Sequence, residues 1–236
     1  MQATIEQRVE SLLWDHVRDS LWRDGYALIP NLLNSSECDE LVASYADDTA
    51  FRSRIVMARF GFGRGEYKYF RYPLPKIVAD LRENLYPRLA RVANSWATET
   101  KKKLFPEKHS VYLKACHAAG QRKPTPLLLK YEPGDFNCLH QDLYGEMAFP
   151  LQVTAFLNRP GADYEGGEFV LVEQRPRMQS RAIVILPNQG EAVIFPTRYR
   201  MVRGTRGVYR TNLRHGVSEL RSGKRYTLGI IFHDAE

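Results

Sequence analysis

Eight short apolar segments, separated by turn residues, fill the second half of the chain and limit its fold more than any other feature. Pro133-Gly134, Glu165-Gly166-Gly167 and Ser222-Gly223 lie between them, where tight connections are needed. Strands of this length and spacing predict two packed antiparallel sheets, a double-sheet jelly roll. The predicted strands are Leu127–Tyr131, Asn137–Asp142, Leu151–Leu157, Glu168–Val172, Arg181–Leu186, Glu191–Phe195, Asn212–Val217 and Tyr226–Phe232.

The first half of the chain has a mainly helical pattern. An apolar stripe predicts a helix from Ile5 to Arg23, and Tyr26–Pro30 reads as a short strand. A capping box at 34–37 begins a second helix, which runs to about residue 46. A third stripe runs from Pro75 to Lys103, where we expect Pro87 to kink or divide the helix. We therefore predict a helical support region at 1–126 and a β core at 127–236, together one compact domain that is mainly β with buttressing helices.

Composition excludes some classes of protein. The chain is 44% apolar, enough for a full core, and has no apolar run of about 18 residues, so we expect no membrane span. Its N-terminus has no apolar signal region, and Cys38, Cys116 and Cys138 are odd in number without a CxxC pair. We therefore expect a cytoplasmic protein with free thiols. The net charge of +7 favours a polyanionic partner but is common in other proteins too.

His140 and Asp142 form the first candidate for chemistry. In a strand, side chains two residues apart point to the same face, so both can reach one metal ion while Gln141 points away. On its own the pair has a plain structural alternative, a hydrogen-bonded His beside a surface Asp.

A third ligand must come from another part of the β region. His16 lies in the first helix, His109 and His117 precede the barrel, and His233 lies at its end. His215, in a predicted strand, is therefore the preferred ligand, with a buried structural His as the alternative. Two His and one carboxylate on one face of a metal are typical of non-haem Fe(II) oxygenases. We predict such an enzyme.

Arg225 and Thr227 share one face of the last predicted strand. A guanidinium on an otherwise apolar strand is costly to bury unless an anion meets it. An Arg fork beside a hydroxyl suits the distal carboxylate of 2-oxoglutarate. Tyr131 could donate a phenolic hydrogen bond to the same molecule, although a lone Tyr can equally be a core residue.

Two basic segments are candidates for substrate contact. In residues 60–72, aromatic side chains alternate with Arg64, Lys68 and Arg71 after several glycines, which favours a lid that stacks a base. The alternative is a hairpin packed on the barrel. Residues 198–214 form an insert that leads into His215 and could hold phosphates or simply be a solvated basic loop. Its arginines are Arg198, Arg200, Arg203, Arg206, Arg210 and Arg214.

Two motifs carry a family resemblance. Tyr131-Glu-Pro-Gly-Asp-Phe-Asn-Cys-Leu-His-Gln-Asp142 resembles a stretch of AlkB-type nucleic-acid demethylases. Glu165-Gly-Gly-Glu-Phe169, Ala192-Val-Ile-Phe195, His215 and Arg225-Tyr226 are similar to prolyl-hydroxylase-type members of the same Fe(II)/2-oxoglutarate superfamily. As a whole the chain resembles a bacterial group of 2-oxoglutarate oxygenases described as oxidatively demethylating damaged DNA.

The resemblance implies a double-stranded β-helix that uses Fe(II), 2-oxoglutarate and O2. It implies that His140, Asp142 and His215 hold iron and that Arg225, Thr227 and Tyr131 hold the cosubstrate. Two positions depart from the AlkB pattern, because Leu129 replaces an Asn and Ile231 replaces a second Arg.

The resemblance also implies a reaction, the oxidation of N-alkyl groups on damaged DNA or RNA bases. Oxidation of an N-methyl carbon gives a hemiaminal, which releases formaldehyde and the repaired base; the base must be unstacked to react. The alternatives are a prolyl-type protein hydroxylase acting on a peptide, a small-molecule hydroxylase, and a jelly-roll binding module without catalysis.

Overall fold

The computed structural model describes residues 3–142, 144–205 and 207–236. In these ranges the helices are α1 (Ile5–Ser11), α2 (Trp14–Arg23), α3 (Ser35–Ser44), α4 (Lys76–Glu99) and α5 (His109–Ala118), with short 3-10 turns at Asp48–Ala50 and Met57–Phe60. The strands are β1 (Ala27–Ile29), β2 (Phe51–Val56), β3 (Gly63–Arg64), β4 (Glu66–Phe70), β5 (Leu127–Tyr131), β6 (Phe136–His140), β7 (Leu151–Phe156), β8 (Tyr164–Gly166), β9 (Phe169–Gln174), β10 (Arg181–Ile185), β11 (Ala192–Pro196), β12 (Tyr199–Gly204), β13 (Gly207–Val217), β14 (Leu220–Gly223) and β15 (Arg225–Ile230).

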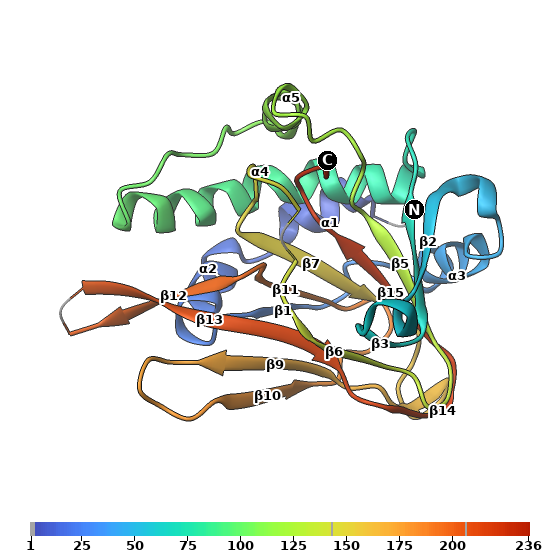
Figure 1. Cartoon of the computed structure of the whole chain (residues 1–236). Coiled ribbons are helices and arrows are strands. Elements are labelled where there is room, and N and C mark those ends of the chain that lie inside the picture. Colours follow the sequence, from blue (N-terminus) through green and yellow to red (C-terminus); the bar gives the residue numbers. More distant parts are fainter. Residues whose placement is uncertain (1–2, 143, 206) are drawn as a thin grey trace.

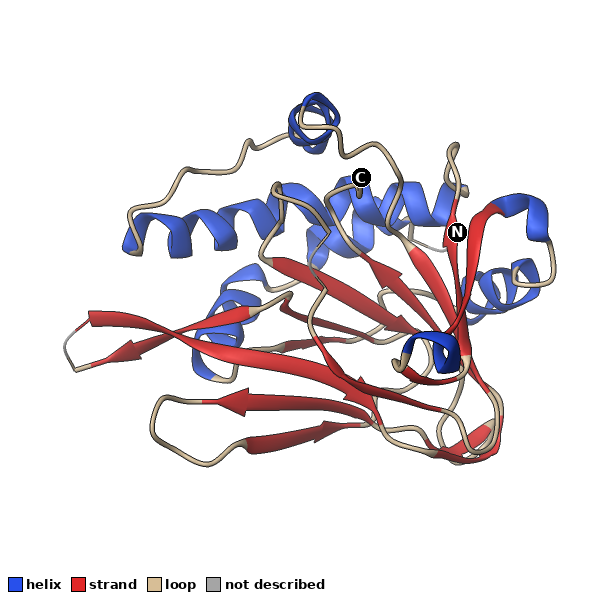
Figure 2. Cartoon of the chain, viewed as in Figure 1, coloured by secondary structure: helices blue, strands red, loops and turns tan. Residues whose placement is uncertain are grey.

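Two antiparallel sheets face each other, as the strand pattern predicts. The larger has the order β1-β11-β7-β15-β5-β4-β2, and the smaller has the order β10-β9-β13-β6-β3 with β12 paired to β13. Helices α1 and α4 cover the outer side of the larger sheet, and the smaller sheet lies on its other side (Figures 1 and 2). The prediction of a jelly roll with buttressing helices is confirmed. Residues 1–126 contribute β1, β2 and β4 as well as helices.

Helix α4 supplies most of the support for the larger sheet. Its stripe of Leu81, Leu85, Leu89 and Trp96 is buried in the main apolar core. Removal of that much apolar surface from water is the main stabilising term for such an element. Pro87 lies inside one continuous helix, so the expectation that it divides the helix is wrong.

The predicted helix from Ile5 to Arg23 is two helices. Leu12 is extended (φ −65°, ψ 141°) and ends α1, while the Trp14 indole donates to the Val9 carbonyl at 2.8 Å across the break. The break leaves Leu13 exposed. The capping box is confirmed, because the Asn34 side chain accepts from the Glu37 amide at the start of α3.

The segment 60–72 is only in part a surface loop. Glu66–Phe70 is strand β4, hydrogen-bonded between β2 and β5 in the larger sheet. Lys68 is buried; it donates to the Tyr45 carbonyl and pairs with Asp48 at 2.6 Å. A lid function therefore stays a prediction only for the part before β4, where Phe60 and Phe62 are exposed and stacked.

Strand boundaries differ from prediction in two places that affect the site. Strand β6 ends at His140, so Asp142 follows the strand instead of belonging to it. The basic insert is the hairpin β12–β13 instead of a loop, and β13 runs from Gly207 through the predicted strand (Figure 1). The small sheet of β8 and β14 was not predicted.

Candidate metal and cosubstrate site

Neighbouring strands of the smaller sheet place the two histidines together. His140 on β6 and His215 on β13 are direct partners in the antiparallel ladder. Side chains directly opposite in such a ladder lie on the same face about 5 Å apart. The two imidazole rings accordingly lie 4.1 Å apart between centroids, and Phe195 packs against His215 from the other side at 4.8 Å.

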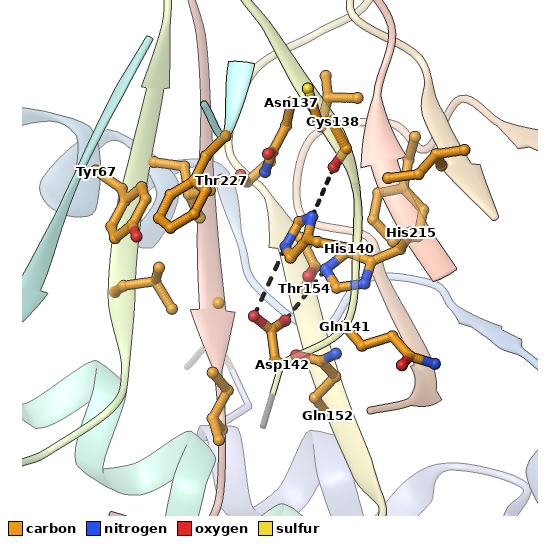
Figure 3. Close-up of a pocket in the computed structure, with 18 of the residues that line it drawn as sticks. Tyr67, Asn137, Cys138, His140, Gln141, Asp142, Gln152, Thr154, His215 and Thr227 are labelled. Carbon is orange, nitrogen blue, oxygen red and sulfur yellow. Dashed lines mark hydrogen bonds and ion pairs between the residues drawn. The ribbon is translucent and has the colours of Figure 1, made fainter. Parts of the chain in front are cut away.

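Asp142 reaches the same point from the loop after β6. Its Oδ1 lies 3.6 Å from His140 Nε2, and its Oδ2 lies 3.2 Å from His215 Nε2 (Figure 3). One ligand atom from each of the three residues lies within 4.8 Å of the others. The i, i+2 strand argument for Asp142 is wrong in its geometry, since the loop, not the pleat, turns the carboxylate toward the histidines. Gln141 extends away and donates to the carbonyls of Arg198 and Leu213, at 2.9 Å each.

The protonation of His140 and Asp142 suits metal binding. His140 Nδ1 lies 2.8 Å from the Cys138 carbonyl, which fixes the tautomer with Nε2 free toward Asp142 (Figure 3). Burial, together with His215, lowers the pKa of His140 and favours the neutral imidazole. Burial acts to raise the pKa of Asp142, but the neighbouring His215 outweighs it and the pKa lies well below its usual range. Neutral imidazole and ionised carboxylate are the forms that bind a metal.

A cavity of about 330 Å³ between the two sheets contains these three side chains. Arg225 on β15 and Tyr131 on β5 are register partners at its wall, and Thr227 lies on the same face of β15. Gly167 leaves space for the side chain of Arg225, because a Cβ there would lie 2.9 Å from Arg225 Cδ. The structure thus brings together all six residues predicted from the sequence.

Several polar atoms of this cavity make no hydrogen bond of ordinary geometry with the described residues. They are Nε and Nη1 of Arg225, the Tyr131 hydroxyl and Nε2 of Gln152, and all three residues are less than 5% exposed. Burial raises the pKa of Tyr131 to about 12, so its hydroxyl is a donor at neutral pH. Buried donors without a partner are costly, and they normally meet a ligand or an ordered water. A cationic fork, a phenol and an amide fit a dicarboxylate, and the three ligands fit Fe(II).

Sequence reasoning missed two residues of this site. Gln152, the only polar side chain with an amide in the apolar strand β7, gave a readable signal. Tyr144 donates to Asp142 Oδ1 at 2.9 Å and accepts from Tyr69 at 3.1 Å. No local pattern marks Tyr144, because the contact depends on how the loop folds back.

The arginines of the basic insert have different environments. Arg200 is buried, paired with Glu173 at 3.1 Å and bonded to the carbonyls of Trp22 and Arg23, so its predicted role in phosphate binding is wrong. Arg198, Arg203, Arg210 and Arg214 are exposed, and Arg206 lies outside the described residues.

Comparison with known proteins decides the family. The model of the Oxygenase-NA family, described as an oxygenase catalysing oxidative methylation of damaged DNA, matches residues 65–235. The chain belongs to this family. It is an oxygenase. Two uncharacterized proteins from strains of Mycobacterium tuberculosis are each 50% identical to it over 167 residues, 70% of this chain and 72% of theirs.

Solved structures of low sequence identity share the fold. A prolyl-4-hydroxylase from Pseudomonas putida has a TM-score of 0.54 at 15% identity, covering 92% of this chain and 96% of its own. A 2OG-Fe(II) oxygenase family oxidoreductase from Burkholderia pseudomallei has a TM-score of 0.55 at 16% identity, covering 95% and 93%. Within the described residues of this oxygenase, no helix has the length and apolar character needed to cross a membrane.

Proposed function

We propose that this oxygenase depends on Fe(II) and 2-oxoglutarate and removes N-alkyl groups from damaged nucleic-acid bases. The observation that carries the proposal is one cavity that holds both a His–Asp–His cluster and a buried guanidinium without a carboxylate partner among the described residues. The family description names damaged DNA as the substrate. An enzyme of this kind oxidises C–H bonds, and oxidation of an N-methyl carbon leads to loss of the methyl group.

In this proposal His140, Asp142 and His215 hold the iron on one face. When bound, Fe(II) with 2-oxoglutarate and O2 supplies the oxidation of a nearby C–H bond. The carbonyl of Cys138 and the hydroxyl of Tyr144 hold His140 and Asp142 in the orientation that ligation needs.

Arg225, Thr227 and Tyr131 bind the distal carboxylate of 2-oxoglutarate. Arg225 supplies the opposite charge, and its position between the rings of Tyr131 and Phe156, 5.3 Å from each centroid, restricts its rotation. Leu129 and Ile231 line the same cavity, where AlkB-type enzymes have Asn and Arg. Fewer polar groups therefore hold the cosubstrate than in that pattern.

A protein hydroxylase of the prolyl type is the second candidate, because the later motifs resemble that group and a prolyl-4-hydroxylase shares the fold. Peptides and bases differ in the product that they yield. Hydroxylation of a peptide adds oxygen and keeps the carbon atom, whereas oxidation of an N-methyl base releases formaldehyde.

The test is turnover with Fe(II), 2-oxoglutarate and O2 on methylated single-stranded oligonucleotides and on proline-containing peptides. We expect formaldehyde in a one-to-one ratio with succinate from the oligonucleotides. A mass increase of the peptides without formaldehyde would replace the first proposal by the second. Absence of oxygen-dependent succinate with every substrate would contradict both.

A further inference from the structure

A second cavity lies between the C-terminal end of α4 and the start of β12. Its volume is about 210 Å³, and Trp96, Phe105 and Met201 give it apolar walls. We call it the Tyr199 pocket, after the half-exposed ring of Tyr199 at its edge. None of its lining residues lines the metal cavity.

The Tyr199 pocket carries four exposed cations. Lys102 and Lys103 come from the segment after α4, and Arg198 and Arg210 come from the basic hairpin. No carboxylate lines the pocket, and none of the four cations forms an ion pair with a described residue. Uncompensated like charges around one cavity make a bound anion favourable.

The aromatic ring indicates what kind of anion fits. The guanidinium carbons of Arg198 and Arg210 lie 4.5 Å and 5.2 Å from the Tyr199 ring centroid. A partly exposed ring beside two cations combines an aromatic surface with phosphate donors, as in proteins that bind single-stranded nucleic acid. A small inorganic anion would leave the apolar walls unused. A nucleotide would contact both the cations, through its phosphate, and the apolar and aromatic walls, through its base.

One short segment separates this pocket from the metal cavity. Tyr144 lines the metal cavity, and Ala148 and Pro150 line the Tyr199 pocket. Gln141, between the two proposed ligands of the β6 side, donates to the Arg198 carbonyl at 2.9 Å. The backbone of the pocket is therefore fixed directly to the loop that carries Asp142.

We infer that the Tyr199 pocket binds a nucleotide that flanks the target base in a single strand, with its phosphates on the four cations and its base against Tyr199. This inference rests on the proposed function, because it places the rest of a nucleic-acid substrate whose damaged base enters the metal cavity. It assigns a contact to Arg198 and Arg210 and none to Arg200.

The test compares two variants that lose the same charge. Arg198→Ala/Arg210→Ala removes the cations beside Tyr199 and keeps the carbonyl that accepts from Gln141. Arg177→Ala/Arg181→Ala removes two exposed arginines at the β9–β10 hairpin, which line neither cavity. Binding of a fluorescein-labelled single-stranded oligonucleotide with one N-methyladenine is measured by anisotropy at several salt concentrations, after thermal unfolding has shown that both variants fold.

We expect the first variant to bind the oligonucleotide roughly tenfold more weakly, and the slope of log K against log salt to fall by about 1.4, since each phosphate contact on a single strand contributes about 0.7. The control variant should stay near wild type. Binding of the methylated mononucleotide, which has no flanking nucleotide, should be unchanged in both. Tyr199→Phe should keep oligonucleotide affinity, and Tyr199→Ser should lower it.

Equal oligonucleotide binding by the two charge variants would overturn the inference. So would a variant Arg198→Ala/Arg210→Ala that binds an acidic peptide more weakly but binds the oligonucleotide like wild type. The proposed function fails separately. If the enzyme releases formaldehyde from methylated DNA while Arg198→Ala/Arg210→Ala binds like wild type, only the inference falls. If only peptides are hydroxylated, the proposed function is wrong, and the inference that rests on it is wrong as well.

Discussion

Three buried arginines, each no more than 2% exposed, have very different surroundings. Arg82 pairs with Asp234 at 2.7 Å and donates to the carbonyls of Ile231 and His233. Arg200 pairs with Glu173 at 3.1 Å. Arg225 has no carboxylate within ion-pair distance in the part of the chain that the structure describes, and two of its nitrogens face no acceptor.

The presence or absence of a carboxylate partner distinguishes buried arginines that stabilise the fold from one that is available to bind a ligand. A buried charge is tolerated only when a partner offsets its lost hydration. Arg82 and Arg200 find that partner within the fold, so their ion pairs connect α4 to the C-terminal segment and β12 to β9. Arg225 lacks one inside a cavity, and this is the reason to assign it a dicarboxylate from outside.

The largest expected effect concerns the cavity with the unpaired arginine. His140→Ala should abolish turnover, since two remaining ligands do not hold the metal on one face. Its unfolding temperature without metal should stay near wild type. His16→Ala, at an exposed position of α2, is the control and should retain turnover. Substantial turnover by the first variant would reject His140 as a ligand.

Breaking the buried ion pair of Arg82 and Asp234 should lower folding stability, whereas His140→Ala should lower only turnover. Asp234→Ala leaves Arg82 buried without its carboxylate, and we expect a loss of about 3–5 kcal/mol in the free energy of unfolding. Urea denaturation measures it. Asp80→Ala, which breaks the exposed pair with Lys76, should cost less than about 1 kcal/mol. Equal losses would show that burial of the pair is not decisive.

Arg225→Met should have the opposite effect on folding. It removes an unpaired buried charge, so the stability of the ligand-free protein should be unchanged or higher. The Kd for 2-oxoglutarate should rise roughly 30-fold or more, because a buried charge pair with the ligand is lost. Calorimetry measures the Kd, with exposed Arg221→Met as the control. Destabilisation as large as that of Asp234→Ala would mean that Arg225 is structural.

Low pH should lower the folding stability through the two buried histidines near Arg82, His109 and His233. Burial, aided by Arg82, lowers the pKa of His109 and of His233 to about 4, so both are neutral in the fold. Unfolded histidines bind a proton below pH 6.5, so the unfolded state gains protons first as the pH falls. Stability should be full above pH 6.5 and fall toward pH 4 by about 1.4 kcal/mol per unit for each residue. Denaturation of the metal-free protein should show a shallower decline in His109→Gln.

The smallest expected effect concerns the hydroxyl that orients Asp142. Tyr144→Phe should weaken metal binding about tenfold, the scale of other supporting hydrogen bonds around metal ligands. Metal titration monitored by fluorescence measures it, with exposed Tyr209→Phe as the control. Unchanged metal affinity in Tyr144→Phe would mean that the loop alone positions the carboxylate.

Local sequence patterns were sufficient to predict most of the fold and the kind of chemistry at the site. The short apolar segments between turn residues predicted the eight core strands, and the capping box at Asn34 located α3, because both patterns depend on neighbours along the chain. The residue types at 140, 142 and 215 predicted a metal cluster, although Asp142 reaches it from a loop that no pattern indicated. Lys68 was misjudged because only the pairing of β4 inside the sheet buries it.

The sequence by itself determined which side chains could bind a metal and a dicarboxylate, and that the chain would form two sheets. Only the tertiary structure decided which arginines remain available. Arg200 lies in β12 and Arg225 lies in β15, yet Glu173 pairs with the first and no described carboxylate pairs with the second. Charge compensation depends on distances between residues far apart in the chain, and local patterns do not contain those distances.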